Sequence, residues 1–158
     1  MARRSGFTLV EVLAVLAIMG IAAAMAAPSL GAYVRRQRVR GALDLLAGDV
    51  QYARMLAVRN GRPAVLRWER APECAWAGLR GGYRYSVGLR GAPPGAAKRA
   101  TIRPAGGPVC VHMNGGDSLV FNSRGLLVSF SNRTVWAKEG RVQDSLTISV
   151  MGRVLRRY

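Results

Sequence analysis

Hydrophobic and polar residues divide this chain of 158 residues into three consecutive patterns. Residues 7–34 are almost entirely apolar and contain one charged side chain, Glu11. A helix needs about 20 apolar residues to cross the hydrocarbon core of a bilayer, so this segment predicts a membrane-spanning helix. Residues 35–61 then place apolar residues at helical spacing, and from residue 62 the spacing becomes that of strands.

The second pattern predicts that the helix continues beyond the apolar segment with one apolar face. Spacings of three and four residues separate its apolar positions, which are Val39, Leu43, Leu46, Val50, Ala53 and Ala57. A single stripe of this kind has to pack against another part of the protein. Asn60 and Gly61, with Pro63 soon after, predict the end of the helix.

The third pattern predicts short strands between residues 62 and 158. Ala64, Leu66 and Trp68 alternate with other residues, as in a strand with one buried face. Further strands are predicted at residues 83–89, near 101–102, and at 109–113, 118–122, 126–131 and 145–150. A hairpin turn is predicted at residues 115–117. One long helix followed only by strands predicts an α+β fold, in which the helix packs on an antiparallel sheet.

The charge balance favours polyanionic partners. The chain has 24 Lys and Arg residues against 8 Asp and Glu, a formal net charge of +16. Such a balance favours binding to nucleic acid or anionic lipid. Lys98 and Lys138 are the only lysines, and arginine binds phosphate and stacks on bases better than lysine does. A GC-rich genome would explain arginine in place of lysine, but not the excess of cations over acids.

One cluster of arginines directly follows the apolar segment. It consists of Arg35, Arg36, Arg38 and Arg40. Arginines this close to a membrane-spanning segment are expected to contact lipid head groups. By charge counting alone, this cluster outweighs Arg3 and Arg4 on the other flank and would reverse the orientation of the helix.

The sequence predicts neither a catalytic site nor a metal or cofactor site. With no Cys-x-x-Cys motif and His112 as the one histidine, the ligand sets of metal sites are absent from the sequence. It also lacks a G-x-S-x-G element, a paired-histidine motif and a P-loop, so no enzyme is expected. Cys74 and Cys110 are expected to form a disulfide outside the cytoplasm, with two buried free thiols as the alternative.

The start of the apolar segment resembles the type IV pilin and pseudopilin class. A short basic leader precedes the motif Gly6-Phe7-Thr8-Leu9-Val10-Glu11. The resemblance implies that prepilin peptidase removes residues 1–6 by cleaving after Gly6 and that the new N-terminal Phe7 is methylated. A carboxylate in an apolar helix needs a partner, which for Glu11 is the new amino terminus of its own chain or of a neighbouring copy. In the second arrangement Glu11 directs assembly.

An ordinary secretory signal is the alternative for this segment. Arg3 and Arg4 would form its basic region, residues 12–21 its apolar region and residues 24–26 an Ala-x-Ala cleavage site. Glu11 at the start of the apolar run and the helical pattern beyond Pro28 favour the pilin interpretation instead.

Two further stretches resemble the GspH/FimT branch of minor pilins and pseudopilins. They are Phe121-Asn122-Ser123-Arg124-Gly125 and the segment from Ile148 to Val154, and Phe121 and Gly125 are expected to be structural. The resemblance implies a type IV pilin-like fold, an inner-membrane precursor with a periplasmic globular domain, and later assembly into a pilus with other pilins or pseudopilins through the N-terminal helix. The implied divisions are a leader (1–6), a transmembrane and assembly helix (7–34), an amphipathic helix (35–61) and a β domain (62–158).

The end of the chain carries the functional hypothesis. Some FimT-like members bind DNA in natural transformation through a Gly-Arg-x-Arg element, and this chain ends Gly152-Arg153-Val154-Leu155-Arg156-Arg157-Tyr158, with the second arginine one residue late. The resemblance implies DNA binding without sequence preference by these residues, namely Gly152, Arg153, Arg156, Arg157 and Tyr158. Guanidinium groups would bind phosphates and the tyrosine ring would stack on a base.

A structural subunit is the alternative to a DNA receptor. On a regular strand Arg153 and Arg157 would share one face and Arg156 would lie on the other. The arginines of a last strand can also serve only to keep a sheet edge soluble. The protein would then be a structural minor pilin or a GspH-like pseudopilin of a type II secretion system, without DNA binding.

Overall fold

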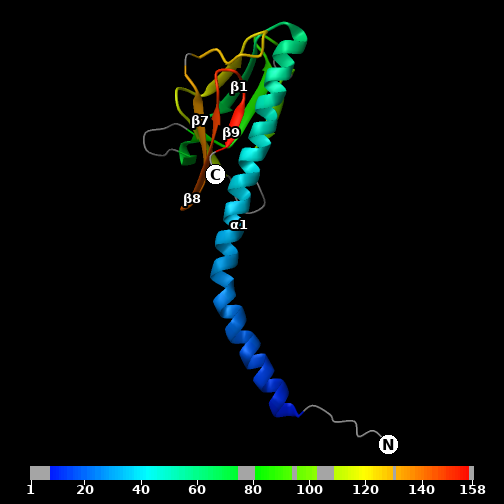
Figure 1. The fold of residues 1–158 in the computed structure, drawn as a ribbon, viewed down its shortest axis with the longest axis vertical. Coiled ribbons are helices and arrows are strands. Elements are labelled where there is room, and N and C mark those ends of the chain that lie inside the picture. Colours follow the sequence, from blue (N-terminus) through cyan, green and yellow to red (C-terminus); the bar gives the residue numbers. More distant parts are fainter. Residues whose placement is uncertain (1–7, 75–80, 94–95, 103–108, 130, 157–158) are drawn as a thin grey trace, which may run out of the picture. The chain divides into compact units, whose positions relative to one another are not determined.

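The computed structural model describes residues 8–74, 81–93, 96–102, 109–129 and 131–156, with residues 26–29 described in backbone only. Gly6 and Phe7 at one end, and Arg157 and Tyr158 at the other, lie outside the described residues. The chain divides into two units, residues 1–35 and residues 36–158. One helix, α1 (Leu9–Asn60), contributes residues to both units (Figure 1).

The first turn of α1 is capped by a side chain. The Oγ1 atom of Thr8 accepts a hydrogen bond from the backbone N–H of Glu11 at 3.3 Å, as the first residue of a Thr-x-x-Glu capping box does. Glu11 therefore lies in the first helical turn, where the helix dipole favours a negative charge. From the sequence, Glu11 was predicted to act in assembly, and this local role was not predicted.

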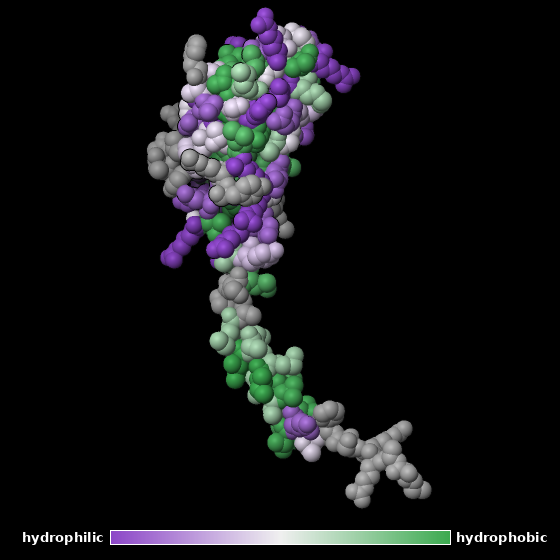
Figure 2. All heavy atoms as spheres, in the orientation of Figure 1, coloured by the Kyte–Doolittle hydropathy of each residue, from purple (hydrophilic) through white to green (hydrophobic). Residues whose placement is uncertain are grey.

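The first unit leaves its apolar side chains exposed. Leu9 is 79 % exposed and Leu16 is 59 % exposed, and Figure 2 shows the hydrophobic colour along this part of the helix. Among the described residues, no single helix has the length and hydropathy of a membrane span. A bent pair, Leu9–Met25 with Leu30–Asn60, meets that condition by length and composition.

The last turn of α1 ends where the sequence predicts. Gly61 has a φ of 60°, a left-handed conformation that glycine adopts without a steric penalty. The N–H of Gly61 donates to Val58 O at 3.3 Å, and the N–H of Arg62 donates to Ala57 O at 3.2 Å. These two bonds form a Schellman motif, which satisfies carbonyls that a helix end leaves without a partner.

The globular unit consists of the second part of α1 and two antiparallel sheets. The first sheet has the order β4-β3-β1-β6 and the second the order β2-β5-β7-β8-β9. The elements after α1 are β1 (Ala64–Glu69), the short helix η1 (Pro72–Cys74), β2 (Gly81–Gly82), β3 (Arg84–Leu89), β4 (Lys98–Thr101), β5 (Cys110–Met113), β6 (Ser118–Phe121), β7 (Arg133–Glu139), β8 (Val142–Ile148) and β9 (Val154–Arg156). The predicted α+β fold is confirmed, with two sheets where the sequence suggested one.

The core lies between α1 and the two sheets. Every residue of the predicted apolar stripe on α1 is buried, with an exposed fraction of 0 % at each of its six positions. The stripe belongs to one hydrophobic cluster with buried residues of both sheets, such as Leu66 and Leu146. Trp68 and Tyr85 lie on neighbouring strands with ring centroids 4.7 Å apart. The period of the apolar residues therefore identified the packed face correctly.

Two predictions about strand pairing are wrong. Residues 115–117 are not a hairpin turn, because β5 and β6, on either side of them, belong to different sheets. Residues 126–131 contribute only an isolated bridge between Leu127 and Phe121 within the described residues. The N–H of Leu127 donates to Val150 O and the N–H of Val128 donates to Val120 O, so the segment divides its hydrogen bonds between two partners. Strand β7, which pairs with both β5 and β8, was not predicted.

Polar contacts and a disulfide hold the layers together. Asp49 on α1 is buried, accepts a hydrogen bond from the Tyr85 hydroxyl at 2.7 Å, and forms an ion pair with Lys98. Burial and this carboxylate raise the pKa of Tyr85 well above its usual range. Cys74 and Cys110 form the predicted disulfide, which joins η1 to β5.

Candidate nucleic-acid interface

The turn before β9 depends on a glycine. Gly152 has a φ of 74°, and its N–H donates to Ser149 O at 2.8 Å. A Cβ atom at this position would lie 2.8 Å from Gly125 O and 3.1 Å from Arg54 Cδ. Gly152 is buried, so it shapes the turn and is not exposed to a ligand. The same contacts place the turn that contains Gly125 beside this one.

Arg153 is the exposed cation of this turn. Its backbone is held in place, because the N–H of Arg153 donates to Ser149 Oγ at 3.1 Å and its carbonyl accepts from Ser149 N–H at 2.8 Å. Within the described residues its guanidinium has no hydrogen-bond or ion-pair partner. Arg124, in the neighbouring turn, is also exposed. Arg124 was not predicted to lie at this site, although it directly precedes Gly125 in the sequence.

Arg156 has different surroundings. Its Nη2 atom lies 2.7 Å from Asp44 Oδ1 and donates a hydrogen bond to Arg40 O at 3.1 Å. Its side chain is 25 % exposed, whereas the Asp44 side chain is 64 % exposed. Leu155, the residue before it, is exposed, as alternation along β9 requires. The structure therefore places Arg156 against α1 and Arg153 in solvent.

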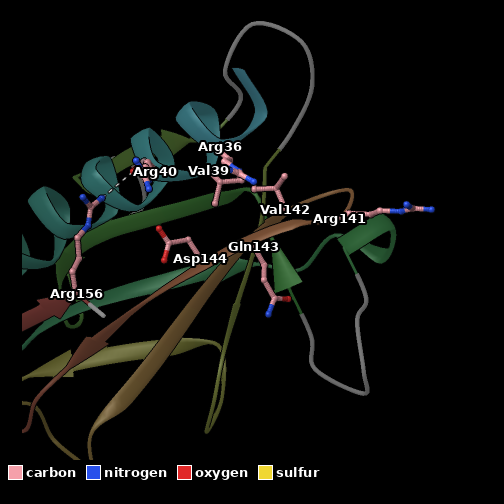
Figure 3. Close-up of a pocket in the computed structure, with 8 residues that line it drawn as sticks. All are labelled: Arg36, Val39, Arg40, Arg141, Val142, Gln143, Asp144 and Arg156. Carbon is pink, nitrogen blue, oxygen red and sulfur yellow. Dashed lines mark hydrogen bonds between the residues drawn. The ribbon is translucent and has the colours of Figure 1, made fainter. Parts of the chain in front are cut away.

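A cavity of about 550 Å³ lies beside Arg156. It is formed by the first turns of α1 within the globular unit, the β7–β8 hairpin and β9, and Figure 3 shows its lining residues. Those residues are Arg36, Val39, Arg40, Arg141, Val142, Gln143, Asp144 and Arg156. We call this cavity the arginine groove. In Figure 3 the Arg141 side chain points away from the helix, so Arg141 lies at the rim.

The groove joins residues that the sequence analysis treated separately. Arg36 and Arg40 were assigned to a cluster next to the membrane, and Arg156 to a C-terminal DNA site. Arg141 was assigned to neither. The spacing of four residues between Arg36 and Arg40, which puts them on one helix face, was the available signal.

The chemistry available at both places is anion binding. A guanidinium group donates up to five hydrogen bonds and stays charged at physiological pH, so it binds phosphate without exchanging protons. Among the described residues, no group of three or more His, Cys, Asp or Glu side chains could hold a metal ion. Both places are therefore suited to binding anions through phosphate groups.

Two family models match the chain. The model described as the prokaryotic N-terminal methylation motif matches residues 1–27, and the model described as type II transport protein GspH matches residues 42–152. No match is found among curated proteins.

Solved structures with a similar fold include a minor pilin. A crystal structure of the Pseudomonas aeruginosa type IV minor pilin FimU matches with a TM-score of 0.61 and 22 % identity, over 80 % of this chain and 92 % of that chain. A second crystal form of FimU matches with a TM-score of 0.56 and 21 % identity, over 75 % of this chain and 92 % of that chain. At these identities the likeness shows a shared fold.

Proposed function

The chain belongs to the GspH family of type II transport proteins, and we propose that it is a minor type IV pilin that binds DNA through its basic C-terminal residues. Minor pilins and pseudopilins of this family are structural subunits, and the methylation motif implies a membrane-anchored precursor that is processed and then assembled with other pilins or pseudopilins. DNA binding is the added function that this proposal assigns.

The proposal includes the processing and assembly of the N-terminal segment. Prepilin peptidase cleaves after Gly6, and Phe7 becomes the methylated N-terminus. The globular unit faces the periplasm before assembly and the cell surface afterwards. Glu11 then pairs with the positive terminus of a neighbouring subunit, and this pairing makes its carboxylate an assembly signal.

The exposed guanidinium of Arg153 carries the DNA proposal. It lies on a structured turn, next to an edge strand, and has no acidic partner among the described residues. Arg156 follows three residues later, about 10 Å along an extended chain, and Arg157 comes next in the sequence. A DNA strand has one phosphate for every 3.4 Å or so of helix axis, so these cations span several phosphates.

Binding of this kind is independent of sequence. The arginines lie on a turn and a strand edge, and no helix of the globular unit presents them for insertion into a major groove. Phosphate contacts position a protein on DNA but carry no base information. The affinity comes from release of counterions and therefore falls steeply with salt.

The ion pair of Arg156 favours a second candidate function. Because Asp44 and Arg40 O already bind this guanidinium, Arg156 can serve to fix β9 against α1. A protein in which all C-terminal arginines served this purpose would be a structural minor pilin or a type II secretion pseudopilin without DNA binding.

DNA binding by the full chain in an uncharged detergent distinguishes the two functions. Fluorescence anisotropy with labelled duplex DNA is measured at several salt concentrations for the wild type and for Arg153→Ala/Arg156→Ala/Arg157→Ala. A matched control removes three exposed arginines elsewhere on the globular unit, in the variant Arg67→Ala/Arg90→Ala/Arg99→Ala.

We expect the C-terminal variant to reduce the slope of log affinity against log salt by about 0.9 for each phosphate that is no longer neutralised, and so by about 1 to 2, because Arg156 is already paired with Asp44. The matched control should change the slope little. Equal reductions in both variants would assign the binding to diffuse charge. No binding by the wild type at moderate salt would leave the structural function.

A further inference from the structure

The arginine groove lies apart from the exposed Arg153, which is not among its lining residues. Arg36 and Arg40 lie one helical turn apart on α1 and both line the cavity. Within the described residues, neither guanidinium is paired with a carboxylate. Arg38, between them in the sequence, differs because its Nη1 lies 3.1 Å from Glu139 Oε1. Two of these neighbouring arginines therefore remain available to a ligand.

The acidic residues near the groove leave it positive. Asp44 binds Arg156, and Asp144 is the one carboxylate that lines the cavity. The Oδ1 atom of Asp144 accepts a hydrogen bond from Ser145 N–H at 2.7 Å. Four arginines against these two acids favour an anion of one or two charges. A cavity of about 550 Å³ has the size of a small-ligand site, whereas a DNA duplex is far too wide to enter it.

Chain connectivity keeps the groove close to the apolar segment. Arg36 is two residues after Val34 and Arg40 is six residues after it. Even a fully extended chain limits these separations to about 7 Å and about 22 Å. If the apolar segment lies in a membrane, the groove arginines are within reach of the head-group layer, whatever the arrangement of the two units.

From these observations we infer that the arginine groove binds the phosphate of an anionic phospholipid while the precursor is in the membrane. Arg36 and Arg40 donate to the phosphate oxygens, and Arg156 adds positive charge at the strand side. The head group occupies the cavity between α1 and the β7–β8 hairpin. The lipid thereby holds the globular unit at the membrane surface before assembly. Each basic side chain near an anionic surface adds to the binding free energy, so two arginines together should strengthen lipid binding measurably.

The test uses the full chain in an uncharged detergent and native mass spectrometry with phosphatidylglycerol. We expect one retained phosphatidylglycerol per chain, in preference to phosphatidylcholine. Arg36→Gln/Arg40→Gln should weaken this retention at least about tenfold. Arg67→Gln/Arg90→Gln makes the same change in net charge at exposed positions away from the groove and should retain the lipid. Asp144→Asn removes the acid from the cavity and should strengthen retention.

Several results would overturn the proposal. Equal weakening by both arginine pairs would show attraction by net charge alone. Equal retention of phosphatidylcholine would show that apolar contacts with the acyl chains, and not the anionic head group, hold the lipid. Displacement of the lipid by inorganic phosphate at comparable concentration would make a free anion the ligand.

The same variants separate this inference from the DNA function. Arg36→Gln/Arg40→Gln should keep the salt-dependent DNA binding that depends on Arg153. Loss of DNA binding with lipid retention unchanged would assign the groove to DNA and overturn the lipid site. Loss of lipid retention with DNA binding unchanged is the result that supports the proposal.

Discussion

The two parts of α1 have the same backbone structure but opposite surroundings. Before residue 35 the helix is apolar on all sides, and its side chains, such as Leu16, are exposed. After residue 36 one stripe of apolar residues, from Val39 to Ala57, is fully buried in a core shared with the sheets of the same chain, while Leu45, Met55 and Val58 lie outside it and are exposed. The first part therefore needs a membrane or other subunits to cover it, whereas the second part is covered by its own domain.

The largest expected difference comes from one substitution made in each part. Leu43→Ala removes a fully buried side chain from the stripe and should lower the free energy of unfolding of the globular unit by about 2 to 5 kcal/mol. Leu16→Ala makes the same chemical change in the first part and should alter that free energy by less than about 0.5 kcal/mol. Denaturant unfolding of the full chain in detergent measures both. Equal effects would contradict the division of α1 into two environments.

A smaller difference is expected between two acids of the second part. Asp49→Ala leaves the buried Tyr85 hydroxyl without its partner and should cost about 1 to 3 kcal/mol of unfolding free energy. Asp44→Ala breaks an exposed ion pair with Arg156 and should cost about 0 to 1 kcal/mol. The same denaturant measurement applies. In the double variant Asp49→Ala/Tyr85→Phe the cost should be smaller than the sum of the single costs, because the two groups share one interaction.

The smallest expected effect is a pH dependence confined to the globular unit. Burial, with a contribution from Lys138, holds the pKa of His112 below its ordinary value. The unfolded state then binds a proton more readily, so this contribution to stability is present above about pH 6.5 and is lost as pH falls towards the folded-state pKa. Unfolding measured between pH 8 and pH 5 should show this loss, and His112→Gln should reduce it. An identical pH dependence in the variant would exclude His112 as its source.

The pH range also separates His112 from Asp117. A hydrogen bond from Arg70 at 2.9 Å holds the pKa of Asp117 below its ordinary value. A lowered carboxyl pKa contributes stability that is present above about pH 4 and is lost below it. Measurements restricted to pH 5 and above therefore report on the histidine.

Strand prediction succeeded where alternation was strong and failed where it was weak. In strand β1 the apolar Leu66 and Trp68 alternate with the charged Arg67 and Glu69, so its buried face was predicted correctly. The buried face of β7 contains only Val135 and Ala137, between residues with charged side chains at both ends. The apolar run at 126–128 looked more strand-like, but its backbone bonds go to Val120 and Val150. The alternation of apolar and polar residues along a segment does not indicate which other segment its backbone pairs with.

The candidate site was predictable in composition but not in arrangement. The disulfide between Cys74 and Cys110 was predicted from the sequence and is confirmed, whereas the roles of Glu11 and of the C-terminal arginines stay predictions. The partners of Arg156 were not predicted, because Asp44 and Arg40 are distant from it in sequence, with 116 positions between Arg40 and Arg156. Gly152 was assigned to DNA contact, and the structure shows that it packs against Gly125 and Arg54.

The sequence by itself determined that α1 has an apolar first part and an amphipathic second part, where that helix ends, the α+β class and the excess of positive charge. These features depend on neighbours within a few turns or on composition alone, so they are local properties of the chain. Tertiary structure alone decided that the chain crosses between sheets at residues 115–117, and that Arg36, Arg40 and Arg156 share one groove. Those arrangements depend on contacts between residues that are separated by as many as 116 positions, and no local period encodes such contacts.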